Sequence, residues 1–219
     1  MQIKWLKKIC LVGVEFDFDF EDLILDHYDH YVGFFTSKKD KFYSYKRKKL
    51  GKENFKDWKR IKKKFNPDVF ITIDNGHERE ILYKKIYKKN YSNLIFDNSY
   101  VSHSSKKFLL RKRGIIVQKF VKIMPNVKIY DGVKINVNCQ IHHGSIIGKF
   151  ATLAPASVIL GNVKIGNYSY IGANSTILQN IKIGKHSIVG AGSVVTKNIG
   201  DYEVVVGSPA KLLKKNKLI

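Results

Sequence analysis

The sequence predicts a small α/β domain followed by an all-β domain built as a parallel β-helix. Two observations support this fold class. From Val117 to Val195 an aliphatic residue recurs at every sixth position without a break in register. Before that region, strand-like apolar runs alternate with helix-like segments, an order typical of a Rossmann-like α/β domain. We therefore predict two domains, residues 1–94 and residues 95–219.

The period of six indicates short strands separated by tight corners, because the apolar positions of an amphipathic helix recur every ~3.6 residues. Each aliphatic side chain is expected to point inward, and the glycine that often follows it is expected to permit the corner backbone. A small or β-branched residue four positions later fits the inner edge of the corner. Three hexapeptides then form one coil, and the coils stack. The aliphatic row is Val117, Ile123, Ile129, Ile135, Ile141, Ile147, Leu153, Ile159, Ile165, Ile171, Ile177, Ile183, Val189 and Val195.

The N-terminal domain shows the apolar patterns of strands and helices instead of the period of six. Apolar runs at residues 7–16 and 67–74 predict strands, and residues 56–65 and 78–91 predict helices. In the second helix Ile81, Leu82, Ile86 and Tyr87 share one side. Residues 94–115 connect the two domains and are expected to begin the β-helix irregularly.

Composition limits the function classes. The chain of 219 residues has a net charge of +22, and 14 lysines and arginines fall between residues 38 and 64. Such a charge is compatible with a solvated surface, with attraction of anions or membranes, or with polyanion binding. No zinc-finger, RNP or basic-zipper spacing accompanies it. No apolar run reaches ~18 residues, so no transmembrane helix is expected. Two distant cysteines favour a reducing, cytoplasmic location.

Several motifs together resemble one family. The segments "INVNCQIHHGSIIG", "LAPASVILGNVKIG", "IGANSTI", "VGAGSVVTKNI" and "VVGSPAKLL" resemble the hexapeptide-repeat sialic acid O-acetyltransferases and nucleotide-4-aminosugar N-acetyltransferases. In the N-terminal domain "TIDNGHER" resembles the strand-end segment of the same family. The resemblance covers most of the chain.

This resemblance implies a left-handed β-helix, a homotrimer, and acetyl-CoA as the acyl donor. It implies N-acetylation of the 4-amino group of a nucleotide-linked 4-amino-4,6-dideoxyhexose in bacterial surface-glycan synthesis. Two alternatives stay open. One is O-acetylation of a sialic-acid-like or other glycan sugar, and the other is a non-catalytic β-helix scaffold.

The resemblance also implies a catalytic base. A histidine accepts a proton near neutral pH, and the family register places the base at His143 and the accompanying asparagine at Asn136. His143 should face outward from its coil. His142 is interpreted as a turn residue, with His142 as base or no base at all as alternatives. Gly144 stands where the family usually has a carboxylate that supports the base.

The donor site follows from the same resemblance. Gly161, Ala173 and Ala191 match positions where the family's backbone contacts the coenzyme A arm. Lys211 matches a lysine near the coenzyme phosphates, where a cation suits a phosphate. Thr152 stands where some members have a histidine near the thioester. Small residues are also needed at every corner, so a structural role for each of them stays open.

The acceptor site is expected in the N-terminal domain. Of the glycine-rich turn that cradles a nucleotide diphosphate in the family, only Gly13 is present, and acidic residues follow it. Asn75 and Arg79 match plausible acceptor contacts, although Arg79 could equally be a charge on the helix surface. The acceptor is a nucleotide sugar or a sugar without a nucleotide.

Cys139 lies four residues before His143, but it occupies a small inward corner position, so we interpret it as a core residue. Because Cys139 is interpreted as a core residue, direct acetyl transfer in a ternary complex is favoured over an acyl-cysteine route.

No metal is expected, because adjacent histidines seldom point at the same ion and no acidic residue or cysteine completes a ligand set.

Overall fold

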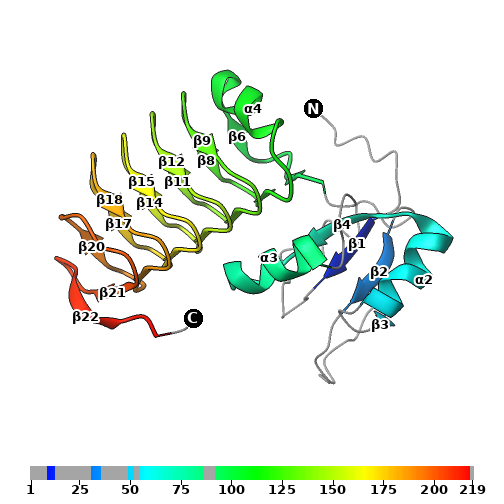
Figure 1. The fold of residues 1–219 in the computed structure, drawn as a ribbon. Helices are drawn as coiled ribbons and strands as arrows, with labels where there is room; N and C mark the ends of the chain where they lie inside the picture. Colours follow the sequence, from blue (N-terminus) through cyan, green and yellow to red (C-terminus); the bar gives the residue numbers. More distant parts are fainter. Residues whose placement is uncertain (1–8, 13–30, 36–48, 52–54, 86–91, 218–219) are drawn as a thin grey trace. The chain divides into compact units, whose positions relative to one another are not determined.

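The structure, a computed structural model, describes residues 9–12, 31–35, 49–51, 55–85 and 92–217. The chain forms two units (Figure 1), one made mainly of Asn93–Ile219 and the other mainly of Gln2–Asp74 and Glu78–Ser92. Among the described helices, none is both long and apolar enough to cross a membrane.

The N-terminal unit contains a four-stranded parallel sheet with the strand order β3-β2-β1-β4. Its strands are β1 (Ile9–Val12), β2 (Tyr31–Phe35), β3 (Lys49–Gly51) and β4 (Asp68–Ile71). Two helices accompany the sheet, α2 (Phe55–Phe65) and α3 (Gly76–Lys85). A parallel sheet with β1 in its interior, and with α2 between β3 and β4, confirms the predicted Rossmann-like arrangement.

The core of this unit lies between the sheet and its helices. Cys10 of β1 and Val69 of β4 are fully buried, and Trp58, Ile61 and Leu82 of the helices are at most 8% exposed. Burying side chains of this size stabilises a domain by about 1.5–3 kcal/mol each. Leu82 therefore lies on the inner side of α3, as its position in the sequence predicted.

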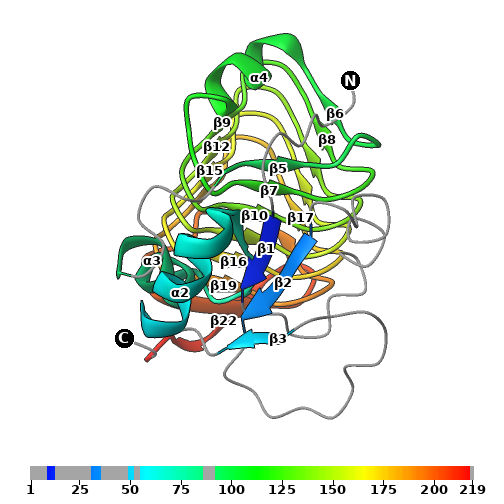
Figure 2. The same cartoon turned by 90° about the vertical axis from the view of Figure 1, so that its right-hand side faces the viewer.

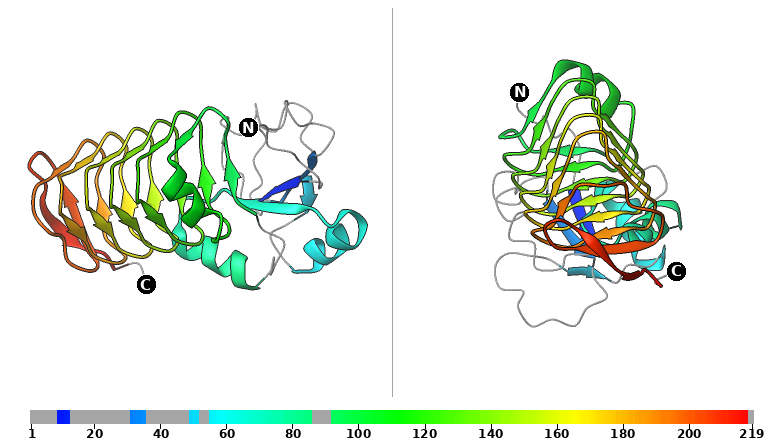
Figure 3. Two further views of the ribbon diagram at one scale, coloured as in Figure 1. Left: turned by 90° about the horizontal axis from the view of Figure 1, so that it is seen from above. Right: turned by 90° about the vertical axis from the view of Figure 1, so that its left-hand side faces the viewer.

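The C-terminal unit is a parallel β-helix whose coils stack in sequence order, from green to red in Figures 1 and 3. Three sheets run along its faces. The first sheet contains β5 (Leu94–Ile95), β7 (Ile116–Val117), β10 (Lys134–Ile135), β13 (Thr152–Leu153), β16 (Tyr170–Ile171), β19 (Ile188–Val189), β21 (Glu203–Val206) and β22 (Lys211–Lys215). The second contains β6 (Tyr100–Val101), β8 (Lys122–Ile123), β11 (Gln140–Ile141), β14 (Val158–Ile159), β17 (Thr176–Ile177) and β20 (Val194–Val195). The third contains β9 (Lys128–Ile129), β12 (Ile146–Ile147), β15 (Lys164–Ile165) and β18 (Lys182–Ile183).

The strand register confirms the predicted repeat of three hexapeptides per coil. Lys134 of β10 pairs with Thr152 of β13, and Thr152 pairs with Tyr170 of β16. Partners along each face are thus eighteen residues apart. Figure 2 and the right-hand view of Figure 3 look along the stack, so that successive coils overlap.

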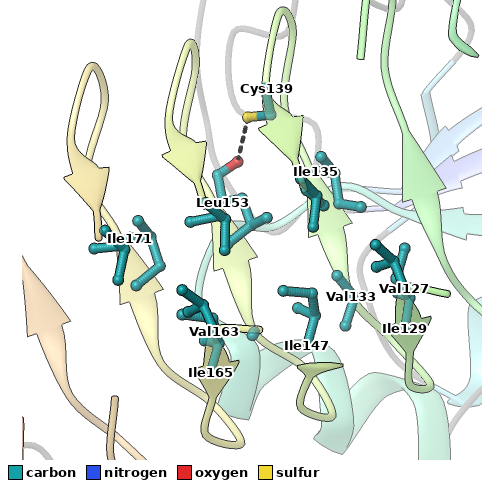
Figure 4. Packing of buried hydrophobic residues seen from close by; sticks show 14 of the residues in the cluster. Val127, Ile129, Val133, Ile135, Cys139, Ile147, Leu153, Val163, Ile165 and Ile171 are labelled. Carbon is teal, nitrogen blue, oxygen red and sulfur yellow. Dashed lines mark hydrogen bonds between the residues drawn. The ribbon is translucent and has the colours of Figure 1, made fainter. Parts of the chain in front are cut away.

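The aliphatic row fills the interior of the coils, as predicted. Its members are between 0% and 3% exposed and stack face by face, as Ile135, Leu153 and Ile171 do in Figure 4. The small residues four positions later are buried as well, and Ser145 and Ser169 donate from Oγ to the carbonyls of Leu160 and Gly184. These two buried hydroxyls are therefore hydrogen-bonded to backbone of the next coil, whereas Ser175 donates to the carbonyl of Gly172 in its own coil.

The corners correct one prediction. The residue with a left-handed backbone is three positions after each aliphatic, not the glycine directly after it. These residues have φ between 53° and 70°, and they are Phe120, Asn126, Gly132, Asn138, Gly144, Phe150, Ala156, Asn162, Tyr168, Asn174, Asn180, His186 and Gly192. The glycines after the aliphatics serve close stacking instead. A Cβ on Gly166 would lie 2.5 Å from the backbone of the next coil at Gly184.

Side chains at these left-handed positions stack from coil to coil. We call the corner between the first and second sheets the first corner, the next one the second corner, and the one between the third and first sheets the third corner. At the third corner the rings of Tyr168 and His186 are stacked 4.6 Å apart, with Phe150 and Tyr202 continuing the stack on either side. At the second corner the Asn162 amide donates to Oδ1 of Asn180 over 3.4 Å.

Both ends of the β-helix are irregular. In the first coil α4 (His103–Leu109) takes the place of a strand on the third face and packs against β9. Its buried Ser105 accepts from the N–H of Val127 and donates to the carbonyl of Met124. The connecting segment thus begins the β-helix irregularly, as predicted. At the C-terminal end of the β-helix, β22 pairs antiparallel with β21.

Candidate active site

His143 stands at the second corner, directly before the left-handed Gly144, where the chain leaves β11 and turns toward β12. Its side chain is exposed, as predicted. The carbonyl of His143 accepts from the N–H of Asn162, which ties its backbone to the next coil. Neither ring nitrogen has a hydrogen-bond partner among the residues that the structure describes. The imidazole is therefore held by its backbone and remains open to an incoming molecule.

The ring of His143 lies against Gly161, its counterpart eighteen residues later. A Cβ on Gly161 would lie 2.8 Å from both Cε1 and Nε2 of the imidazole. A Cβ atom is essentially never found that close to another heavy atom, so the imidazole would have to move. Gly161 thus provides a flat surface that lets the ring lie along the second corner.

The backbone conformation and surroundings of Gly144 account for the absence of a carboxylate side chain next to His143. Its φ of +70° is a conformation that glycine adopts more easily than other residues. A Cβ at this position would also lie 2.3 Å from Oδ1 of Asn162. The space next to the candidate base is therefore occupied by the Asn162 carboxamide, and no side chain at residue 144 fits beside it without a shift.

Asn136 lies at a different corner from His143. It is 5% exposed at the first corner, and its Nδ2 donates to the carbonyl of Leu153 over 3.0 Å. The strand β11 separates the two residues within one coil. A single chain consequently does not bring Asn136 and His143 together.

The predicted coenzyme residues divide between the same two corners. Gly161 accompanies His143 at the second corner, whereas Ala173 and Ala191 lie at the first corner, eighteen residues apart. The backbone N–H groups of these three residues have no hydrogen-bond partner in the described part of the chain. Each of them can therefore donate to a carbonyl of a bound molecule.

The other two residues predicted to bind the acetyl-CoA donor, Thr152 and Lys211, lie outside these two corners. Thr152 is in β13 on the first sheet and is 1% exposed. Lys211 begins the exposed strand β22. Neither shares a corner with His143 in this chain.

Cys139 is fully buried at the first corner, as predicted for a core residue. Its Sγ lies 3.1 Å from the carbonyl of Ala154 and 3.3 Å from Oγ of Ser157 (the bond to the Leu153 carbonyl is dashed in Figure 4). Burial raises the pKa of the thiol, while the hydrogen bond with Ser157 opposes that shift. A protonated, buried thiol is a poor nucleophile.

The predicted acceptor residues follow the neighbouring strands β1 and β4 of the N-terminal unit. Gly13 comes directly after β1 and lies outside the described residues. Asn75 follows β4, and its Oδ1 accepts from the N–H of His77 at the start of α3. In parallel α/β sheets, ligands bind beyond the carboxyl ends of the strands where the strand order reverses. The sheet order places β1 and β4 at such a point.

Arg79 is buried rather than a charge on the helix surface, which corrects that alternative. It is 2% exposed, and its Nη1 donates to the carbonyls of Ile73 and Asp74, each over 2.7 Å. Burial lowers the pKa of the guanidinium to about 10, while Asp74 opposes the shift. Arg79 therefore fixes the segment between β4 and α3. Sequence reasoning missed this role because the partners are backbone carbonyls.

In the described ranges, no group of three or more histidine, cysteine, aspartate or glutamate side chains is placed to hold a metal ion.

The family description "Bacterial transferase hexapeptide (six repeats)" matches residues 144–179 and 162–197. This stretch includes the corners that carry Gly144, Gly161, Ala173 and Ala191. Residues 144–197 of the chain therefore match this hexapeptide-repeat family. No curated protein sequence matches it.

Several solved structures share the fold over nearly the whole chain. The perosamine N-acetyltransferase from Caulobacter crescentus, in complex with CoA and GDP-perosamine, has a TM-score of 0.83 and 21% identity, covering 96% of this chain and 98% of that one. The acetyltransferase domain of PglB from Neisseria gonorrhoeae, in complex with acetyl coenzyme A, has a TM-score of 0.79 and 20% identity, covering 94% and 99%. WeeI from Acinetobacter baumannii AYE has a TM-score of 0.72 and 24% identity, also covering 94% and 99%. These comparisons confirm the predicted fold class across both units.

Proposed function

We propose that the protein is an acetyl-CoA-dependent N-acetyltransferase that acts on the 4-amino group of a nucleotide-linked 4-amino-4,6-dideoxyhexose in bacterial surface-glycan synthesis. The observation that carries the proposal is the exposed imidazole of His143, which lies against Gly161 and whose ring nitrogens have no hydrogen-bond partner among the described residues. The similar C. crescentus enzyme was crystallised with CoA and GDP-perosamine, which supports this class of donor and acceptor.

In this reaction the amino nitrogen of the sugar attacks the thioester carbonyl of acetyl-CoA. His143 takes the proton that the nitrogen loses, which is the role of a general base. The C–S bond then breaks, the amide forms, and coenzyme A leaves as a thiolate that takes up a proton. The unpaired N–H of Gly161 is a suitable donor for the oxyanion that develops on the carbonyl oxygen.

Coenzyme A would lie along the corners of the β-helix. The unpaired N–H groups of Ala173 and Ala191, one coil apart, suit the amide carbonyls of the pantetheine arm. The small side chains let that arm approach the backbone closely. Lys211, on the exposed strand β22, would meet its phosphates. Thr152 is only 1% exposed in β13 and offers no surface to the thioester in this chain.

We further propose that the protein acts as a homotrimer. Asn136, Ala173 and Ala191 lie at the first corner, and His143 and Gly161 at the second, so one chain holds only part of the site at each corner. A site shared by two copies would join the first corner of one chain to the second corner of its neighbour. Sedimentation should then give three times the 25.2 kDa chain mass.

The acceptor would bind to the N-terminal unit beyond β1 and β4. Gly13 directly follows β1, and Asn75 lies four residues after the end of β4. Arg79 holds the carbonyls of Ile73 and Asp74 in place. This arrangement suits a nucleotide or sugar at the carboxyl edge of the sheet.

The deciding experiment is a thiol-release assay with acetyl-CoA and a panel of nucleotide-linked 4-aminosugars and hydroxyl sugars. We expect coenzyme A release only with an amino acceptor, and a product heavier by one acetyl group. Release with hydroxyl sugars alone would replace the proposal by O-acetylation. If no acceptor gives turnover and coenzyme A does not bind, the chain is a β-helix scaffold.

A further inference from the structure

Helix α2 (Phe55–Phe65) has one buried side and one strongly basic side. Trp58 and Ile61 are 2% and 6% exposed and anchor the helix in the core of the N-terminal unit. Six residues of the other side are all exposed: Lys56, Lys59, Arg60, Lys62, Lys63 and Lys64. We call these six the basic face of α2. The buried side fixes the helix, so the basic face is presented to solvent as a rigid unit.

Little negative charge balances this face. Asp57 is the only acidic residue of α2, and it lies 4.0 Å from Arg60. No carboxylate among the described residues lies within ion-pair distance of the five lysines. Lys59 and Lys63 are four positions apart, a spacing at which like charges destabilise a helix. The helix C-terminus offsets part of this repulsion for Lys62, Lys63 and Lys64.

We propose that the basic face of α2 docks on the anionic surface of a phospholipid membrane. Clusters of four to eight lysines and arginines on an amphipathic helix bind acidic headgroups, and each cation near such a surface strengthens binding about fivefold. The six exposed cations lie within this range. Among residues 56–65 of α2 no apolar side chain is exposed, so the contact is peripheral and electrostatic, without insertion into the hydrocarbon.

The same observations disfavour a nucleic acid as the partner. Five of the six cations are lysines, which act as point charges and lack the planar fork with which arginine grips phosphates and base edges. The indole of Trp58 is buried, so it offers no ring on which a base could stack. A diffuse array of cations matches a headgroup surface better than a groove.

The test is co-sedimentation of the full chain with vesicles of phosphatidylcholine containing phosphatidylglycerol, and with vesicles of phosphatidylcholine alone. We expect binding only to the anionic vesicles at about 0.1 M salt, and loss of that binding at about 1 M salt, where the Debye length falls to about 3 Å. Lys59→Glu/Lys63→Glu should weaken binding more than a hundredfold, and Lys59→Gln/Lys63→Gln about 25-fold.

Lys164→Glu/Lys182→Glu is the matched control. These two exposed lysines are paired neighbours on β15 and β18 of the C-terminal unit, and their replacement makes the same change in net charge. Equal loss of binding in the control would show that only the net charge matters, and would overturn the assignment to α2. Equal binding to both vesicle types, or to neither, would also overturn the proposal. So would tighter binding to duplex DNA that the α2 variants abolish.

Discussion

The imidazole of His143 lies against Gly161, and only the absence of a Cβ on that glycine allows it. The added atom would be 2.8 Å from Cε1 and Nε2. The two residues are eighteen positions apart and become neighbours only because the coils stack. The position of the candidate base is therefore set by the next coil.

Gly161→Ala should displace the imidazole and lower kcat. A misplacement of about 1 Å can cost on the order of 100-fold in rate, and we expect a loss of about 10- to 100-fold with unchanged thermal stability. Steady-state kinetics with varied acetyl-CoA measures it. Gly200→Ala is the control, because a Cβ there meets only the carboxylate of Glu203. A kcat equal to that of the wild type would show that the ring has room elsewhere.

His143→Ala should lower kcat by about 10²–10⁴-fold, the usual contribution of a general base. Because the side chain is exposed and its ring unbonded in the described structure, the free energy of unfolding should change by less than about 0.5 kcal/mol. His142→Ala is the matched neighbour and should retain most of the activity. The assignment is wrong if His142→Ala is the more damaging of the two.

Gly144→Asp, which restores a carboxylate beside the base, should destabilise the protein. The residue has φ +70°, and its Cβ would lie 2.3 Å from Oδ1 of Asn162, so we expect a loss of about 1–3 kcal/mol in urea unfolding. Combining it with Asn162→Gly removes the steric part. The double-mutant cycle should then show a coupling above about 0.5 kcal/mol, and strict additivity would contradict the contact.

Alkaline pH should weaken the fold through the buried thiols. Burial raises the pKa values of Cys139 and Cys10, so the folded state keeps protons that the unfolded state releases above its thiol pKa of about 8.5. The contribution is constant below that pH, and stability falls as the pH rises above it. Urea unfolding at pH 7 and pH 9.5 should show a smaller fall for Cys139→Ala than for wild type. An equal fall in both would rule out Cys139 as a cause.

Arg79→Ala should destabilise the N-terminal unit by about 2–4 kcal/mol, because the carbonyls of Ile73 and Asp74 lose a charged, buried donor. Arg79→Lys keeps a cation and should recover part of that loss. Denaturant unfolding measures both variants. If Arg79→Ala instead raises only the KM for the acceptor and leaves stability unchanged, Arg79 is a ligand contact rather than a fixed element of the loop.

The repeat could be predicted from the sequence because an aliphatic residue at every sixth position indicates which side chains point into the core. The left-handed corners were harder, since Phe120, Tyr168 and His186 adopt a conformation that their residue types do not signal. The stacking of coils imposes it. The site illustrates the same limit. Asn136 and His143 are seven residues apart in sequence, yet a strand and a corner separate them, and only the coil geometry shows this.

The final strand of the β-helix runs in the reverse direction. A stack of parallel coils ends in a row of unpaired backbone groups onto which the coil of another molecule could add. On the first sheet, β22 covers that row by pairing antiparallel with β21, and it carries Lys211, Lys214 and Lys215. Lysines on an edge strand repel further strands. The tail thus terminates the first sheet, and its lysines disfavour end-to-end growth into fibres.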